Sequence, residues 1–97
     1  MVHKYITTYV VIFGSSRSLS EVLPMLKEIM SELNFSSVVA DQYGIPRKLN
    51  ESTFAITSAM AINEIEDLIR ITCLDLPAFE LELNIMPADV YFYDVFH

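Results

Sequence analysis

Basic side chains are scarce in this sequence: six Lys and Arg stand against 13 Asp and Glu, which gives a formal net charge of −7. Nucleic-acid-binding proteins usually carry a basic surface, because phosphate neutralisation and counterion release supply much of the affinity. An acidic chain can bind RNA only if its few cations gather in one place. Composition alone therefore favours a protein-binding module over an RNA-binding one.

Other absences narrow the class of protein further. The single cysteine, Cys73, excludes an intramolecular disulfide and suits a reducing compartment. No apolar run approaches the roughly 20 residues that span a bilayer, and the first residues lack the pattern of a secretory signal. With two Gly, four Pro and 53% hydrophobic residues, the chain is too apolar to be disordered. We therefore expect one cytoplasmic domain over residues 1–97.

The hydrophobic pattern predicts alternating strands and helices. Strands are expected over 4–13, 36–42, 53–59 and 79–85. Helices are expected over 20–33, with Pro24 in an irregular first turn and Asn34 as the stop, and over 61–74. A short further helix is expected to begin near Pro87. This order predicts an α+β, ferredoxin-like βαββαβ sandwich: an antiparallel sheet with two helices on one face, followed by a short C-terminal helix.

This topology makes a prediction about the scarce cations. Right-handed crossovers bring four segments to one end of a βαββαβ sandwich: the loop after the first strand, the start of the first helix, the connection between strands two and three, and the end of the second helix. That end would hold Arg17, Arg47 and Lys48, with Arg70 as a further candidate. A basic patch of this kind would answer the objection from net charge.

The first strand carries aromatic residues whose role is open at this stage. Tyr5, Tyr9 and Phe13 share one face of the strand, and the other face is apolar as well. On an open sheet such a stripe could stack on RNA bases. Such stripes are more often covered, here by the C-terminal residues 91–93 or by a second subunit.

No self-contained catalytic motif is present. The sequence has no P-loop, no Cys-x-x-Cys pair, no His-Glu-x-x-His and no nucleophile elbow. His3 and His97 lie at the chain ends, where fraying is expected, and Cys73 lies on the apolar stripe of the second helix, as a core residue would. Metal-independent RNA cleavage needs a base for a 2′-hydroxyl and a cation for the charged phosphorane. Lys and Arg can supply the cation, and the candidate bases are Tyr, Asp and Glu.

Several stretches of the chain, in order, resemble the GhoS family. They are NFSSVVADQYGIPR (34–47), the residues 50–57, EIEDLIR (64–70), CLDLP (73–77) and LNIM (83–86), and the similarity extends over about 8–92. The resemblance implies a ferredoxin-like fold and the antitoxin of a type V toxin–antitoxin system. Such an antitoxin is a sequence-selective endoribonuclease that cleaves the mRNA of a small membrane toxin.

The resemblance also implies site residues. Tyr9, Arg47, Phe54 and Arg70 match the family, Lys27 stands where an arginine is expected, and Gly14 where an aspartate can stand. Lysine keeps the charge but loses the bidentate fork of arginine. The resemblance and the basic patch expected from topology together give the candidates. The catalytic candidates are Lys27 and Tyr9, and the RNA-binding candidates are Arg17, Arg47, Lys48, Arg70 and Phe54, of which Arg17 and Lys48 come from the expected patch alone.

The expected partner is the toxin mRNA, bound by a monomer or a homodimer. We expect no metal, no cofactor, no DNA and no membrane. The alternative is a non-catalytic RNA- or protein-binding module of the same fold.

Overall fold

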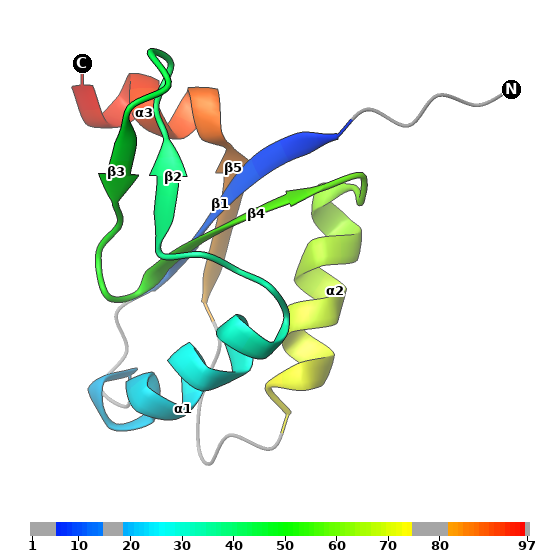
Figure 1. Cartoon of the computed structure of the whole chain (residues 1–97). Coiled ribbons are helices and arrows are strands. Elements are labelled where there is room, and N and C mark those ends of the chain that lie inside the picture. The colour runs from blue at the N-terminus through cyan, green and yellow to red at the C-terminus, as the bar shows by residue number, and fades with distance from the viewer. Residues whose placement is uncertain (1–5, 15–18, 75–81, 97) are drawn as a thin grey trace, which may run out of the picture.

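The order of helices and strands follows the predicted alternation, with one short strand added. The computed structural model describes residues 6–14, 19–74 and 82–96 (Figure 1). Its elements are β1 (Thr7–Phe13), α1 (Leu19–Glu32), β2 (Val38–Ala40), β3 (Pro46–Lys48), β4 (Thr53–Ser58), α2 (Ile62–Thr72), β5 (Leu83–Pro87) and α3 (Ala88–Phe96). The predicted C-terminal helix is confirmed, and β3 is the strand that the sequence pattern did not predict.

The main sheet has three strands in the order β4-β1-β5. Both neighbours run antiparallel to β1, which places Tyr9 opposite Ile56 on one side and opposite Pro87 on the other. The predicted antiparallel sheet is therefore confirmed, with the first strand at its centre.

The predicted second strand departs from the four-stranded sheet of a ferredoxin-like sandwich. Residue Ser36 joins β4 through a single antiparallel bridge, in which its N–H and C=O pair with Ala55 at 2.7 and 2.8 Å. The chain then turns, and β2 pairs with β3 in a separate two-stranded sheet. The expected strand over 36–42 is thus shortened, because hydrogen bonding within the hairpin replaces pairing along β4.

Helices α1 and α2 cover one face of the main sheet, as predicted (Figure 1). Leu26 and Met30 of α1 and Ile65 and Ile69 of α2 are fully buried. They form one apolar cluster with the sheet residues Val11, Phe13 and Phe54 and with Phe35 and Cys73. The expectation that Cys73 is a core residue is confirmed, and burial raises the pKa of its thiol.

The opposite face of the sheet is covered by the β2–β3 hairpin and α3. Its buried cluster consists of Val10 and Ala55 from the sheet, Val39 and Leu49 from the hairpin side, and Phe92 from α3. The expected cover for the aromatic stripe is therefore corrected. Tyr9 and Phe13 pack in the cluster under α1 and α2, while α3 covers the other face; Tyr5 lies outside the described residues.

The ends of α1 reflect local backbone chemistry. Asn34 adopts a left-handed conformation (φ 68°), which asparagine tolerates better than most residues, and the N–H of Phe35 donates to the C=O of Met30 at 2.9 Å. The predicted stop at Asn34 is confirmed. Because α1 begins at Leu19, Pro24 lies beyond its first turn, where it removes one backbone hydrogen bond.

Gly14 lies where β1 ends beside β5, and we expect that a larger residue at this position would destabilise the fold. Its N–H donates to the C=O of Glu82 at 2.8 Å, and a Cβ on Gly14 would lie 2.7 Å from the Cβ of Glu82. We expect Gly14→Ala to lower the free energy of unfolding by about 1–3 kcal/mol through overpacking. Urea denaturation measures this change.

A matched control is Gly44→Asn. Gly44 has φ +76°, which asparagine tolerates, and a Cβ on this glycine would have no atom of the described residues within 4 Å. This variant should change stability much less than Gly14→Ala. Equal effects would show that the close approach of β1 to Glu82 does not constrain the fold.

Candidate functional site

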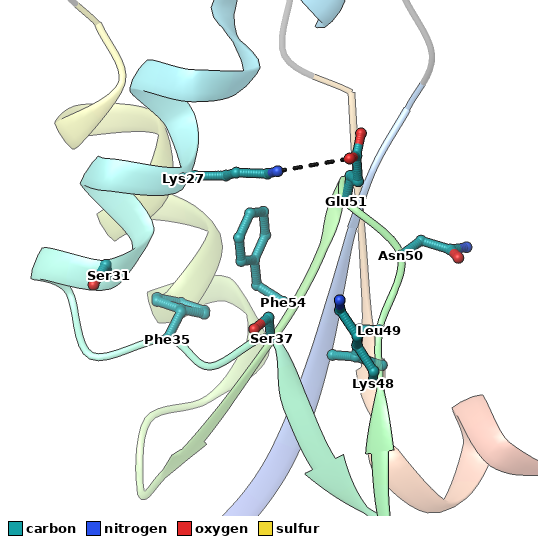
Figure 2. Close-up of a pocket in the computed structure, with 9 residues that line it drawn as sticks. All are labelled: Lys27, Ser31, Phe35, Ser37, Lys48, Leu49, Asn50, Glu51 and Phe54. Atoms are coloured by element: carbon teal, nitrogen blue, oxygen red, sulfur yellow. Dashed lines mark ion pairs between the residues drawn. The ribbon is translucent and has the colours of Figure 1, made fainter.

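A cavity of about 310 Å³ opens between α1 and the segment that joins β3 to β4 (Figure 2). Its position follows from the turn of the chain at Ser36, which carries β2 and β3 away from α1. Nine residues line it: Lys27 and Ser31 of α1, Phe35 and Ser37 of the following segment, Lys48 of β3, Leu49, Asn50 and Glu51 of the connection, and Phe54 of β4.

The floor of the cavity is apolar and fixed. Phe35, Leu49 and Phe54 are each buried. The ring of Phe54 packs edge-on against Phe13, with 5.8 Å between ring centroids and 82° between ring planes. Such packing holds the ring in one orientation, so the floor is preformed.

The rim of the cavity carries two of the chain's six basic residues. The Lys27 Nζ lies 3.9 Å from the Glu51 Oε1, and Figure 2 shows this pair spanning the upper part of the cavity. The Lys48 side chain rises from β3 with its amine directed toward the middle of the lining residues (Figure 2). The cavity therefore joins positive charge to an apolar floor.

The Lys27–Glu51 pair leaves Lys27 available to an anion. The exposed side-chain fractions are 48% for Lys27 and 80% for Glu51. Water and salt screen such exposed pairs, whose contribution to stability is typically below about 1 kcal/mol. The Lys27 amine is therefore held only weakly by Glu51.

Two other predicted cations, Arg47 and Arg70, do not line this cavity. Arg47 donates from Nε to the Oδ2 of Asp41 at 2.9 Å, and Arg70 donates from Nε to the Oε2 of Glu66 at 3.1 Å on the surface of α2. Arg17 lies outside the described residues. Among the described cations that were expected at one end of the fold, only Lys48 lines the cavity, and Lys27 joins it there.

Asp41 organises the hairpin that carries Arg47 and Lys48. Its Oδ1 accepts hydrogen bonds from the N–H groups of Tyr43 and Ile45 at 2.8 and 3.0 Å, and its side chain is 1% exposed. Burial acts to raise the pKa of this carboxyl, but the Arg47 guanidinium and the two N–H donors outweigh burial, so the pKa is lowered. Arg47 therefore has a structural role in the hairpin.

The two remaining predicted residues, Phe54 and Tyr9, lie in different parts of the structure. Phe54 lies in the cavity floor, whereas Tyr9 does not line the cavity and packs against the cluster under α1 and α2. Sequence reasoning did not select six of the lining residues: Ser31, Phe35, Ser37, Leu49, Asn50 and Glu51. Phe35, Ser37, Asn50 and Glu51 lie within stretches that resemble the family, but nothing in those stretches singles them out as site residues.

Two further findings bear on the kind of protein. Within the described ranges, no group of three or more His, Cys, Asp or Glu side chains is placed to hold a metal ion. No helix there is long and apolar enough to cross a membrane.

Comparison with known families decides the relationship. A family model described as "Endoribonuclease GhoS" matches residues 1–94. The chain belongs to the GhoS family. The resemblance seen in the sequence is thereby confirmed at the level of family, and the endoribonuclease description makes RNA the substrate class that the family implies.

The lowered pKa of Asp41 predicts an acid-dependent contribution to stability. A group whose pKa is lower in the fold stabilises the fold above its ordinary pKa of about 3.9, and that contribution is lost as the pH falls through the lowered value. Asp41→Asn should lack this component. Unfolding free energies of both proteins, measured by urea denaturation from about pH 7 down to about pH 2, should converge at the acid end.

The difference in unfolding free energy between wild type and Asp41→Asn is taken at each pH. The other carboxyls titrate in both proteins, so their contribution cancels in this difference. Amide hydrogen exchange at Tyr43 and Ile45 should also be faster in the variant at neutral pH. A difference in stability that stays constant with pH would contradict the charge-based role of Asp41.

Proposed function

We propose that this chain is the antitoxin of a type V toxin–antitoxin system, a sequence-selective endoribonuclease that cleaves the mRNA of a small membrane toxin. The observation that carries the proposal is the GhoS family match over residues 1–94. The cavity beside α1 supports it, because it combines the cations and the aromatic floor that an RNA site needs. The enzyme would act in the cytoplasm, on RNA and without a cofactor.

The family's expected fold also bears on the proposal. The strand order β4-β1-β5 and the antiparallel bridge at Ser36–Ala55 are the pairings of a ferredoxin-like βαββαβ sheet. We propose that this chain is a variant of that sandwich, in which the edge strand is reduced to the bridge and the freed residues form the β2–β3 hairpin. That change opens the cavity at the sheet edge.

The cavity suggests a chemical route. The 2′-oxygen attacks the adjacent phosphorus as its proton passes to the Glu51 carboxylate, which lies beside Lys27. The P–O5′ bond breaks, and the leaving 5′-oxygen takes a proton from solvent. Lys27 stabilises the charge on the phosphorane oxygens, and Lys48 supplies a second positive charge to the same phosphate. The products are a 2′,3′-cyclic phosphate and a 5′-hydroxyl end.

This route requires a 2′-hydroxyl, so the activity should be specific for RNA. Purified protein incubated with the toxin transcript should cut it at defined positions, with and without Mg²⁺. A transcript with a single 2′-deoxy substitution at the cut site should resist cleavage there. Intact transcript under both conditions would defeat the enzyme proposal and leave a non-catalytic binding module.

Substitutions at the Lys27–Glu51 pair should lower the cleavage rate without unfolding the chain. We expect Lys27→Ala and Glu51→Gln each to slow single-turnover cleavage by roughly 10²–10⁴-fold, the range for loss of a positioned proton-transfer or charge-stabilising group. Thermal unfolding should change little, because the pair is exposed. Full activity in Glu51→Gln would remove Glu51 as the base while leaving the family function standing.

Lys48 should contribute to RNA binding through phosphate alone. Lys48→Ala should weaken binding of a single-stranded RNA and reduce the slope of log K against log salt by about 0.7, the value for one phosphate contact on a single strand. Arg70→Gln is the matched control, since it removes one charge outside the cavity. Equal loss in both variants would show that RNA contacts the surface of α2 as well.

A further inference from the structure

We propose that the cavity holds a single unpaired nucleotide of the RNA, with its phosphate between Lys27 and Lys48 and its base against the floor of Phe35, Leu49 and Phe54. The inference deepens the proposed function and rests on it for the identity of the polymer. It adds that the enzyme recognises a nucleotide turned out of any helix.

The size of the cavity limits the size of the ligand that can enter it. A volume of about 310 Å³ lies at the lower end of the roughly 300–1,000 Å³ found for small-ligand sites. The walls are α1 on one side and residues 48–51 on the other (Figure 2). One nucleotide is a ligand of suitable size, whereas a base that is stacked and paired in a duplex cannot enter between these walls.

The chemistry of the lining residues limits the chemical class of the ligand. A bare anion would use only the amines of the rim, and an apolar ligand would use only the floor. A nucleotide uses both, because it joins a phosphate to a flat base whose faces are apolar. Two of six basic residues line this one cavity in a chain of net charge −7, which makes an anionic ligand the complementary one.

The rim also offers groups that can distinguish bases. Ser31 and Ser37 are exposed and lie beside Phe35 in Figure 2, and a hydroxyl can both donate and accept. Asn50 lines the cavity, but its amide points away from Phe54 in Figure 2. Ser37 is therefore the nearer candidate for contact with a base edge.

Glu51 acts as an internal competitor for the nucleotide phosphate. Its carboxylate contacts the same Lys27 amine that the phosphate would use. Removing that charge should free Lys27 and reduce repulsion of the ligand. The proposal therefore predicts opposite changes in nucleotide affinity for substitutions at these two residues. Lys27→Ala weakens nucleotide binding, and Glu51→Gln strengthens it while slowing cleavage.

Nucleotide binding can be measured independently of cleavage. We would titrate ¹⁵N-labelled protein with each of the four nucleoside 3′-monophosphates, with ribose 5-phosphate and with inorganic phosphate. At least one nucleotide should shift the amides of Ser37, Phe54 and Lys27 in a saturable manner. Ribose 5-phosphate and inorganic phosphate should bind about ten-fold more weakly or worse, because they lack the base.

Three variants test the placement. Lys27→Ala should weaken nucleotide binding about ten-fold, the effect of one charge-assisted contact, and Glu51→Gln should strengthen it. Ser31→Trp fills the cavity from α1 and should abolish nucleotide binding while retaining phosphate binding. Met25→Trp, also on α1 but outside the cavity lining, is the matched control and should bind normally.

The outcomes separate this proposal from the proposed function. Saturable binding in the cavity with every RNA left intact would defeat the cleavage proposal and support the nucleotide site. Cleavage of RNA with no saturable shift in the cavity, or with inorganic phosphate bound as tightly as nucleotides, would overturn the nucleotide site. Equal cleavage of one sequence as a single strand and as a perfect duplex would overturn it as well.

Discussion

The structure depends on the need to bury both faces of β1. Val10 and Val11 are adjacent, point to opposite faces, and are both fully buried. A strand of this kind cannot lie on a sheet with one wet face, so each face needs its own cover. Helices α1 and α2 supply one cover, and the β2–β3 hairpin with α3 supplies the other.

The cavity is a consequence of these two covers. The chain must pass from the helix side of the sheet to the hairpin side, and it does so around the edge of β4 between Phe35 and Leu49. Phe35 and Phe54 belong to the cluster under the helices, whereas Leu49 belongs to the cluster under the hairpin. The floor of the cavity is thus the place where the two cores meet at the sheet edge. Its residues are held by packing that the fold already requires.

Periodicity in the sequence was enough to predict most elements and the helix-covered antiparallel sheet. It missed β3 because Pro46–Lys48 is a three-residue strand that begins with proline and shows no alternation. It also placed residues 36–42 in the main sheet, because nothing in their pattern shows which partner they pair with. The choice depends on Asp41, whose bonds to Tyr43 and Ile45 close a turn that keeps β2 and β3 together.

The candidate site was only partly predictable for a related reason. Resemblance and charge pointed to Lys27, Lys48 and Phe54, but Phe35, Leu49 and Glu51 join them only because the chain turns at Ser36. The cation patch expected from topology assumed that the predicted second strand, 36–42, pairs with the main sheet along its length. That segment instead leaves the sheet after Ser36, and Arg47 lies in the β2–β3 hairpin, where it pairs with Asp41.

The charges of this acidic chain are distributed unevenly, with a local excess of positive charge at the cavity. Repulsion from distant carboxylates is screened over about 8–10 Å at physiological ionic strength, so the groups lining the cavity dominate there. Asp41 offsets the charge of Arg47 inside the hairpin, and Glu66 pairs with Arg70 on α2. At the cavity, two lysines face one exposed carboxylate. Among the charged groups that line the cavity, positive charge therefore exceeds negative charge, on a chain whose net charge is negative.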